Sequence, residues 1–384
     1  MNLERLRHEL DHDGLTVAGV LSGTSADGID VGFARLRRED GVWVAPELLT
    51  FVTRPFPDDV AKTVRGILEG RASCGQRELA LLDRDLGRAF GRAVRDVAKM
   101  KKHDVDLIGS HGQTIFHHDD REASGPVTLQ VGGGDFIAAE AGCPVVADFR
   151  QADIAAGGGG APLSPYADDV VFAGVPEPLC VLNLGGIANL TWIHGKQRLA
   201  FDVGPAGALL DGIARYSLGR PFDRDGARAS EGAVDARWVA HLLDHPFFEA
   251  HPPKSTGRDT FGDAWIRERM QRAPGKPEDQ LYGAVLSIAR AVRRAREAWT
   301  PDPSVPCYLA GGGVHNRALV RALMQDLEGP VAISSQVGVD PDAREALVFA
   351  VLAARFVTGE AVTHPEVTGA RKGTILGRLS PGPA

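Results

Sequence analysis

The chain has 384 residues, of which 43% are hydrophobic and 24% charged, and its formal net charge at pH 7 is -7. This length exceeds the usual size of one hydrophobic core and predicts about two domains. The acidic balance gives no support for a nucleic-acid partner or for a polybasic membrane-binding surface.

The positions of the cysteines and of the apolar residues argue against several further classes of protein. The four cysteines are far apart and form no CxxC pair, which argues against a zinc site, a redox motif and a disulfide framework. The N-terminal segment lacks the apolar core of a signal peptide, and no apolar stretch approaches the roughly 20 residues that span a bilayer. We therefore expect a cytoplasmic protein.

The first half of the chain alternates predicted strands with predicted helices. Residues 15–36 form an apolar strand, a polar turn and an alternating strand, which predicts a β-hairpin, and residues 43–52 predict a third strand. Residues 58–102 have helical spacing. Residues 105–117 predict a strand that enters a polar loop. A strand, a glycine-rich turn and a helix are predicted over 128–142, and another strand over 144–150.

The second half opens with the same pattern. Residues 178–195 predict a strand, a glycine-containing turn and a strand, and a third strand and a helix follow over 198–219. Residues 306–325 predict a strand, a triple-glycine turn and a helix. Two hairpin-led halves suggest an internal duplication, although no residue-level repeat supports it. The Gly- and Pro-rich segment 157–171 fits a linker or a loop at a cleft, so the expected domains are 1–165 and 166–384.

Three glycine-rich turns share one chemical character: SGTSADGID (22–30), NLGGIAN (183–189) and AGGGVHN (310–316). Glycine lets backbone N–H groups approach an anion, and nearby hydroxyl groups add donors. Asp27 and Asp30 would suit phosphate only with Mg²⁺ between carboxylate and phosphate. An isolated glycine turn is more often simple loop geometry. Neither GxxxxGK[ST] nor GxGxxG after a strand occurs, so the residues alone indicate a phosphate-binding α/β protein and no more.

These turns resemble the nucleotide-binding turns of the sugar kinase/Hsp70/actin superfamily. Over residues 17–378 the chain is similar to the anhydro-N-acetylmuramic acid kinase family, through GSHGQTIFH, VVADFRQADIAAGGGGAPLSP, FDVGPAGALLDG, FDRDGARASEG, PKSTGRDTFG, REALVFAVLA and VTGARKGTILG. The resemblance implies an α/β protein with a two-domain actin-like ATPase fold. Each domain would have a βββαβα (ribonuclease H-like) core, with ATP in the cleft between them. It also suggests a homodimer.

The resemblance implies which residues bind the nucleotide. The ATP phosphates would lie along the first turn, with Mg²⁺ at Asp27. The second turn would face the phosphates, and the third would pass near the adenosine. The residues implied are Ser22, Gly23, Thr24, Ser25, Ala26, Asp27, Gly28, Ile29, Asp30, Asn183, Gly185, Gly186, Gly311, Gly312 and Gly313.

The resemblance also implies the chemistry and the sugar contacts. Asp202 matches the catalytic aspartate, which would take a proton from the water that attacks the anomeric carbon. Capping of a turn, or of the helix near residue 206, is the competing interpretation. Thr114, Arg150 and Glu345 match positions near the sugar. Arg150 could instead form a buried ion pair, and Glu345 could be an ordinary helix-surface residue.

The implied activity is ATP-dependent opening and O6 phosphorylation of 1,6-anhydro-N-acetylmuramic acid, giving N-acetylmuramate 6-phosphate in peptidoglycan recycling. Three departures leave the exact sugar open, with levoglucosan as an alternative. Gly207 stands where the family usually has Asn, Val203 where it has Thr or Cys, and Gly159 where it has Gln. A non-catalytic or Hsp70-like ATP-binding protein is the alternative from another class.

Two groups of histidines invite the hypothesis of a metal site. His111, His117 and His118 lie beside Asp119 and Asp120, but their spacing matches no known metal site, so a polar surface loop is expected there. A second group, His241, His245 and His251, lies on or after a predicted helix and is expected to be solvated.

Overall fold

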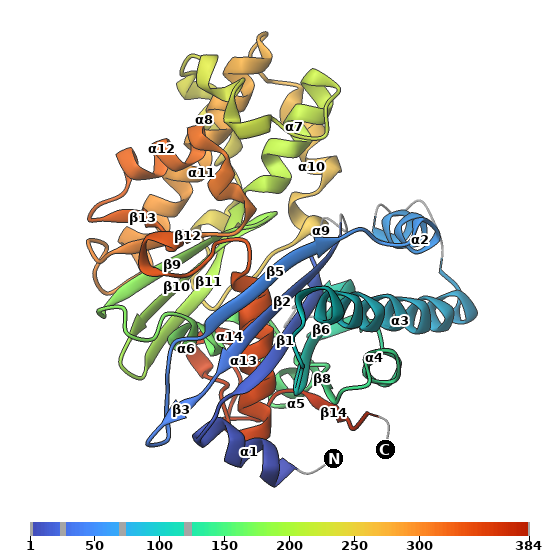
Figure 1. The fold of residues 1–384 in the computed structure, drawn as a ribbon. Coiled ribbons are helices and arrows are strands. Elements are labelled where there is room, and N and C mark those ends of the chain that lie inside the picture. The colour runs from blue at the N-terminus through green and yellow to red at the C-terminus, as the bar shows by residue number, and fades with distance from the viewer. Residues whose placement is uncertain (1–2, 24–27, 69–73, 119–124, 383–384) are drawn as a thin grey trace. The chain divides into compact units, whose positions relative to one another are not determined.

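The computed structural model describes residues 3–23, 28–68, 74–118 and 125–382, and the chain folds into two α/β units (Figure 1). The first unit combines Met1–Val175 with Ala343–Ala384, and the second is Pro176–Asp342. These boundaries differ from the expected 1–165 and 166–384, since residues 166–175 and 343–384 lie in the first unit.

A mixed sheet forms the centre of the first unit. Its strands follow the order β14-β8-β6-β1-β2-β5, and β7 pairs with β6 outside this path. Strand β1 is antiparallel to β2 and parallel to β6, and β6 is parallel to β8. The bounds are β1 Leu15–Ser22, β2 Ile29–Leu36, β5 Glu47–Arg54, β6 Leu107–His118, β7 Val127–Val131, β8 Val145–Ala147 and β14 Arg378–Ser380, with a separate β3–β4 hairpin of Arg38–Glu39 and Val42–Trp43.

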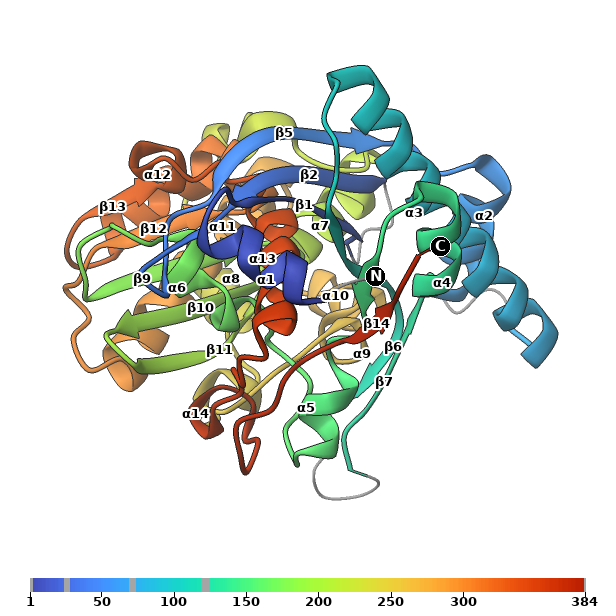
Figure 2. The same cartoon turned by 60° about the horizontal axis from the view of Figure 1, so that its bottom comes forward.

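Helices cover both faces of this sheet (Figure 2). Buried side chains of α3 (Gln76–Lys101) pack with Val20, Val31 and Ile108, whereas the neighbouring Gly19 and Gly109 lie against α13 (Arg344–Thr358). Because successive residues of a strand point to opposite faces, α3 and α13 lie on opposite faces of the sheet. The remaining helices of the unit are α1 Leu3–Asp11, α2 Asp58–Leu68, α4 Gly134–Ala141, α5 Gln151–Ala155, α6 Asp168–Val171 and α14 Pro365–Thr368.

Helix α13 approaches the sheet unusually closely. A Cβ atom built on Gly19 would lie 1.8 Å from the carbonyl oxygen of Ala346, and one on Gly109 would lie 2.0 Å from that of Phe349. Most of the helix, REALVFAVLAARFVT, is buried. A helix that is apolar nearly all round must be covered on all sides, which explains why this late segment returns to the first unit.

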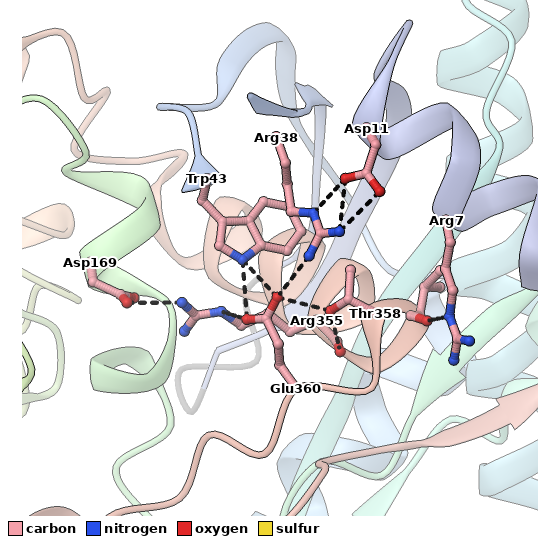
Figure 3. A network of polar contacts seen from close by, with 9 residues as sticks. Arg7, Asp11, Arg38, Trp43, Asp169, Arg355, Thr358 and Glu360 are labelled. Carbon is pink, nitrogen blue, oxygen red and sulfur yellow. Dashed lines mark hydrogen bonds and ion pairs between the residues drawn. The ribbon is translucent and has the colours of Figure 1, made fainter. Parts of the chain in front are cut away.

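Polar contacts connect residues 355–360, at the C-terminal end of α13, with neighbouring elements of the first unit (Figure 3). The Glu360 carboxylate accepts a hydrogen bond of 3.0 Å from Trp43 Nε1 and lies 3.2 Å from Arg355 Nε. Arg355 also pairs with Asp169 at 2.8 Å, and Arg38 pairs with Asp11 on α1 at 2.7 Å. The network ties α6 and residues 355–360 to the N-terminal elements.

Segment 157–171 is not a flexible linker. Gly158, Gly159 and Gly160 are buried, and the amide of Gly160 donates a 2.8 Å hydrogen bond to the buried carboxylate of Asp153. The boundary between the units follows this segment, between Val175 and Pro176.

The second unit repeats the strand order of the first. Its sheet is β11-β10-β9-β12-β13, so the third, second, first, fourth and fifth strands lie side by side, as β5-β2-β1-β6-β8 do in the first unit. The repeat lies in topology and explains why no residue-level repeat is visible. The bounds are β9 Leu179–Leu184, β10 Ile187–His194, β11 Gln197–Pro205, β12 Cys307–Ala310 and β13 Val331–Ile333, with helices α7 Gly207–Leu218, α8 Ala236–Leu242, α9 Arg258–Phe261, α10 Asp263–Met270, α11 Pro277–Trp299 and α12 Arg317–Asp326.

The predicted fold class is confirmed. Each of the two α/β units begins with antiparallel strands, and helices then connect these to parallel strands of the same sheet, as in a ribonuclease H-like core of the actin-like fold. In the part of the chain that the structure describes, no helix has the length and apolar content needed to cross a membrane.

Candidate functional site

Asp202 lies near the end of β11 and is held from both its backbone and its side chain. Its amide donates a 3.1 Å hydrogen bond to the carbonyl of Lys254, and its Oδ2 accepts one of 2.9 Å from the amide of Thr256. Only 9% of Asp202 is exposed. No side chain caps α7, so Asp202 is not a helix cap. Segment 254–256 instead fixes the orientation of its carboxylate.

A buried lysine accompanies this carboxylate. Lys254 is 9% exposed, and its ammonium group donates a 3.0 Å hydrogen bond to the carbonyl of Phe247 and lies 4.6 Å from the centre of that ring. Burial lowers the pKa of Lys254 from its ordinary 10.5 to about 8, although the Asp202 carboxylate acts in the opposite direction. Asp202 therefore has a cation nearby that loses its proton in mildly alkaline solution.

The lowered pKa of Lys254 predicts a stability effect that depends on pH. Between about pH 8 and pH 10.5 the unfolded chain holds more protons at this position than the folded chain, so stability gains with rising pH. Below pH 8, burial of the charged group costs about 3 kcal/mol. We expect Lys254→Met to be more stable than the natural chain at pH 7 and to lose this advantage towards pH 10.

The measurement is the melting temperature of both proteins at several pH values, with Lys196→Met as the matched control. Lys196 is exposed in the turn after β10, so its replacement should change stability little at any pH. A constant difference between Lys254→Met and the natural chain from pH 7 to pH 10 would contradict the lowered pKa.

The second and third glycine turns lie against each other. Strand β12 runs parallel to β9, with Ala310 opposite Asn183. A Cβ on Gly311, whose φ is +81°, would lie 2.8 Å from Oδ1 of Asn183, and one on Gly313 would lie 2.5 Å from Cβ of Leu184. Only glycine permits this approach, so the structure brings two of the predicted nucleotide-binding turns together. The 3-10 turn Gly312–His315 then leads into α12.

The second turn is also fastened to the strand that carries Asp202. The carbonyl of Gly185 accepts a 2.9 Å hydrogen bond from the amide of Gly207, and that of Gly186 accepts bonds of 2.9 and 3.1 Å from Ala206 and Ala208. These amides belong to the start of α7, directly after β11. The hairpin turn and Asp202 are therefore held in one rigid arrangement within the second unit.

The first turn is described only at its two ends. Ser22 ends β1 and is 2% exposed. Gly28 lies so close to Thr53 that an added Cβ would be 2.7 Å from its Cγ2, and the Asp30 carboxylate accepts a 2.6 Å hydrogen bond from the Thr53 hydroxyl. Gly23 and the buried Ile29 adjoin these residues, whereas Thr24, Ser25, Ala26 and Asp27 lie outside the described residues.

Residues 105–117 were expected to form a strand that enters a polar loop, but β6 continues to His118 and pairs with β7. Thr114 lies on this strand, and its hydroxyl accepts a 3.2 Å hydrogen bond from Gln130 Nε2. Arg150, which follows β8, donates from Nε to His111 Nε2 at 3.0 Å and from Nη1 to the Gly160 carbonyl at 2.7 Å. Strand β6 thus brings Thr114 and Arg150 to the same part of the first unit.

His111 is part of this arrangement and not of a solvated loop. Because an arginine Nε–H can only donate, His111 Nε2 is the acceptor and Nδ1 carries the proton, 3.3 Å from the Gly112 carbonyl. Burial, then the charge of Arg150, holds the pKa of His111 well below its usual range, with a smaller effect from His117. The neutral His111 ring therefore accepts a hydrogen bond from Arg150 and helps to orient its guanidinium group.

The structure also shows where the remaining predicted residues lie. Glu345 lies in the first turn of α13, one residue before the Ala346 carbonyl that faces Gly19, and it is half-buried. His251 is exposed, as expected, whereas His241 and His245 are half-buried, and burial lowers the pKa of both. Within the described ranges, no group of three or more His, Cys, Asp or Glu residues could hold a metal ion.

Lys254, Thr256 and Gln113 were not predicted as site residues, and His111 was predicted only as a residue of a polar surface loop. Lys254 and Thr256 lie in PKSTGRDTFG, and His111 and Gln113 lie in GSHGQTIFH, so the quoted motifs contained a signal. The sequence does not show which residues of each motif are buried, because burial depends on which strands and segments pair in the folded chain.

Residues 15–382 match the family model described as "Anhydro-N-acetylmuramic acid kinase". A protein of that name from Salinibacter ruber is 40% identical, with 96% of this chain and 97% of that protein covered. Another from Shewanella halifaxensis is 37% identical, with 94% and 98% covered. Among solved structures, a ROK family glucokinase from Streptomyces griseus in complex with glucose and AMPPNP has a TM-score of 0.39 at 14% identity, covering 89% and 100%.

Proposed function

Since this chain belongs to the anhydro-N-acetylmuramic acid kinase family, we propose that it uses ATP to open and phosphorylate 1,6-anhydro-N-acetylmuramic acid. The product is N-acetylmuramate 6-phosphate, and the reaction serves the recycling of peptidoglycan amino sugars. The observation that carries the chemical assignment is the Asp202 carboxylate, which the Thr256 amide and the backbone of Lys254 hold in one orientation.

Asp202 acts as the general base in this proposal. It removes a proton from a water molecule, whose oxygen attacks C1 of the sugar, and the bond between C1 and O6 breaks. O6 then forms a bond to the γ-phosphorus of ATP, and ADP leaves. A fixed carboxylate favours this step because the catalytic group needs no reorientation at the moment of reaction. The Lys254 ammonium group and the Asp202 carboxylate interact through their opposite charges.

The nucleotide would be held by the glycine turns. Backbone amides of the first and second turns suit phosphate oxygens, and Gly311, Gly312 and Gly313 suit the adenosine because they lack side chains. In the described part of the first turn, the Ser22 hydroxyl and the Asp30 carboxylate are oxygen donors of the kind that Mg²⁺ uses. Asp27 would be a further ligand. Such an ion, when bound, neutralises charge on the β- and γ-phosphates.

Thr114, Arg150 and Glu345 are the proposed sugar contacts. Thr114 offers a hydroxyl on β6, and Arg150 offers a guanidinium group whose orientation His111 and the Gly160 carbonyl fix. A fixed guanidinium suits an anionic group such as the carboxylate that anhydro-N-acetylmuramic acid carries.

The relatives favour anhydro-N-acetylmuramic acid over levoglucosan. Those at 35–40% identity, from Salinibacter ruber to Gloeobacter violaceus, are named for the former sugar. The three departures fit structural roles in this chain. Val203 is 2% exposed, the Gly159 amide donates to the Thr368 carbonyl at 2.8 Å, and a Cβ on Gly207 would lie 3.0 Å from the Gly185 carbonyl oxygen.

The coupling of ring opening to phosphorylation can be tested with isotopically labelled water. O6 of an anhydro sugar carries no proton, so the base can act only on water. In ¹⁸O-enriched water we expect the label at the anomeric hydroxyl and none in the phosphate, measured by mass spectrometry before mutarotation exchanges it. Label in the phosphate would indicate plain ATP hydrolysis. Preference for the already opened sugar would make Asp202 a base for O6 and overturn the proposal.

A further inference from the structure

Strands β6 and β7 carry a row of polar side chains on one of their faces. Thr114 lies directly opposite Gln130 in the antiparallel pairing, and His117 lies opposite Thr128. The register shifts between Thr114 and Phe116, so β6 has one extra residue there. This bulge keeps Thr114 and His117 on the same face as Gln130 and Thr128. Bulges often lie beside functional sites, where they redirect a side chain, and this one surrounds the proposed sugar contact Thr114 with polar groups.

Hydrogen bonds fix the orientation of the Gln130 amide. The Thr128 hydroxyl has one proton, which it donates to the Phe116 carbonyl at 3.3 Å. Its oxygen therefore accepts the 2.7 Å hydrogen bond from Gln130, and the atom of Gln130 that faces it must be the nitrogen, Nε2. Rotation of the amide by half a turn would bring two acceptors together, which would repel each other.

The same nitrogen determines what the Thr114 hydroxyl can do. Nε2 of Gln130 lies 3.2 Å from Thr114 Oγ1 and can only donate, so the hydroxyl oxygen accepts there. Thr114 is half-buried, and no acceptor for its own proton lies among the described residues. A threonine hydroxyl without such a neighbour can rotate and either donate or accept. Here Thr114 is held as a donor, with its proton directed away from Gln130.

Gln130 has no free polar atom with which to contact a ligand directly. Nε2 donates to Thr114 and Thr128, and Oε1 is buried, with no hydrogen-bond partner among the described residues. Any effect of this side chain on the sugar must therefore pass through Thr114. We propose that Gln130 is a positioning residue, which holds the Thr114 hydroxyl as the donor to an oxygen atom of the sugar. This inference rests on the proposed function.

The test is a double-mutant cycle on the KM for anhydro-N-acetylmuramic acid at saturating Mg²⁺–ATP. We expect Thr114→Val, which removes the donor, to raise this KM about tenfold, near the upper size of one neutral hydrogen bond. Gln130→Met should raise it by a smaller factor. The double variant should have the KM of Thr114→Val, because Gln130 acts only through the hydroxyl. Both kcat and the KM for ATP should stay near their natural values in all three variants.

Gln130→Glu reverses the polarity of the side chain at nearly constant shape. Its carboxylate can only accept, so it draws the Thr114 proton away from the sugar. We expect the KM for the sugar to rise at least as much as in Gln130→Met. This variant also replaces Gln130→Met in the test if the latter fails to fold. A natural KM in Gln130→Glu would show that the direction of the hydroxyl does not matter and would overturn the inference.

The matched control is Gln280→Met in the second unit. Gln280 is 8% exposed, and its side chain also has two hydrogen bonds, with the Ser217 hydroxyl and the Pro274 carbonyl. This variant should lower the melting temperature without changing the KM for the sugar.

Three outcomes separate the inference from the proposed function. Additive effects of Thr114→Val and Gln130→Met would mean that Gln130 acts on the sugar by another route, which would overturn the inference but not the proposed function. An equal rise of the KM for ATP in Gln130→Met would mean a general distortion of the first unit, with the same consequence. If the natural chain did not phosphorylate the anhydro sugar at all, the proposed function would fail, and the inference with it.

Discussion

Replacing Asp202 by Asn is expected to lower kcat by roughly 10²- to 10⁴-fold, the usual contribution of a general base. Asparagine keeps the shape of the side chain, and its carbonyl oxygen can still accept from the Thr256 amide. ATP binding and the melting temperature should therefore change little. The measurement is ADP release with the anhydro sugar and Mg²⁺–ATP, together with calorimetric binding of ATP.

A matched control separates loss of the base from loss of a negative charge. Asp244 is exposed after α8, so Asp244→Asn should retain the activity of the natural chain. Near-normal turnover by correctly folded Asp202→Asn would place the base elsewhere. Lost ATP binding in that variant would instead assign Asp202 to the nucleotide site.

The second large effect is expected at the buried ion pair between α13 and α6. Arg344 Nε and Nη2 lie 3.0 and 2.5 Å from the two carboxylate oxygens of Asp168, and the side chains are 1% and 0% exposed. Arg344→Met removes the guanidinium and leaves the buried carboxylate without its counter-charge, which typically costs about 3–5 kcal/mol. We expect a melting temperature several degrees lower, measured by scanning calorimetry.

The double variant Arg344→Met/Asp168→Leu tests this explanation, since it removes both charges at once. It should recover much of the lost stability, because an apolar pair of similar volume needs no compensating charge. Arg215→Met is the control at an exposed ion pair, where Arg215 and Asp263 are 50% and 67% exposed. Its effect should stay below about 1 kcal/mol. A double variant as unstable as Arg344→Met would assign the loss to packing.

The sequence predicted the order of the elements well because each hairpin has its own local pattern. Residues 15–36 and 178–195 alternate apolar residues around a glycine turn, and both form antiparallel pairs. Residues 107–118 were predicted only in part, because His111, Gln113 and Thr114 look like loop residues. Pairing with β7 makes them a strand. Such pairing is a long-range interaction that no local window contains.

Long-range interactions also explain why the domain boundary and part of the site could not be predicted from the sequence. Residues 344–358 have no local property that assigns them to one unit, and Gly19, Gly32 and Gly109 look like ordinary strand glycines until the helix against them is known. Asp202 could be proposed because a motif contains it. Lys254 could not, since its burial depends on Phe247 and Phe201.

The return of residues 343–384 to the first unit makes the second unit an insertion within the first. During synthesis, the face of the first sheet that carries Gly19 and Gly109 therefore has no α13 to cover it until the whole of the second unit has been made. The second unit, Pro176–Asp342, is continuous and can form its sheet from its own residues. The ribosome thus releases the parts in an order in which the unit begun first is completed last.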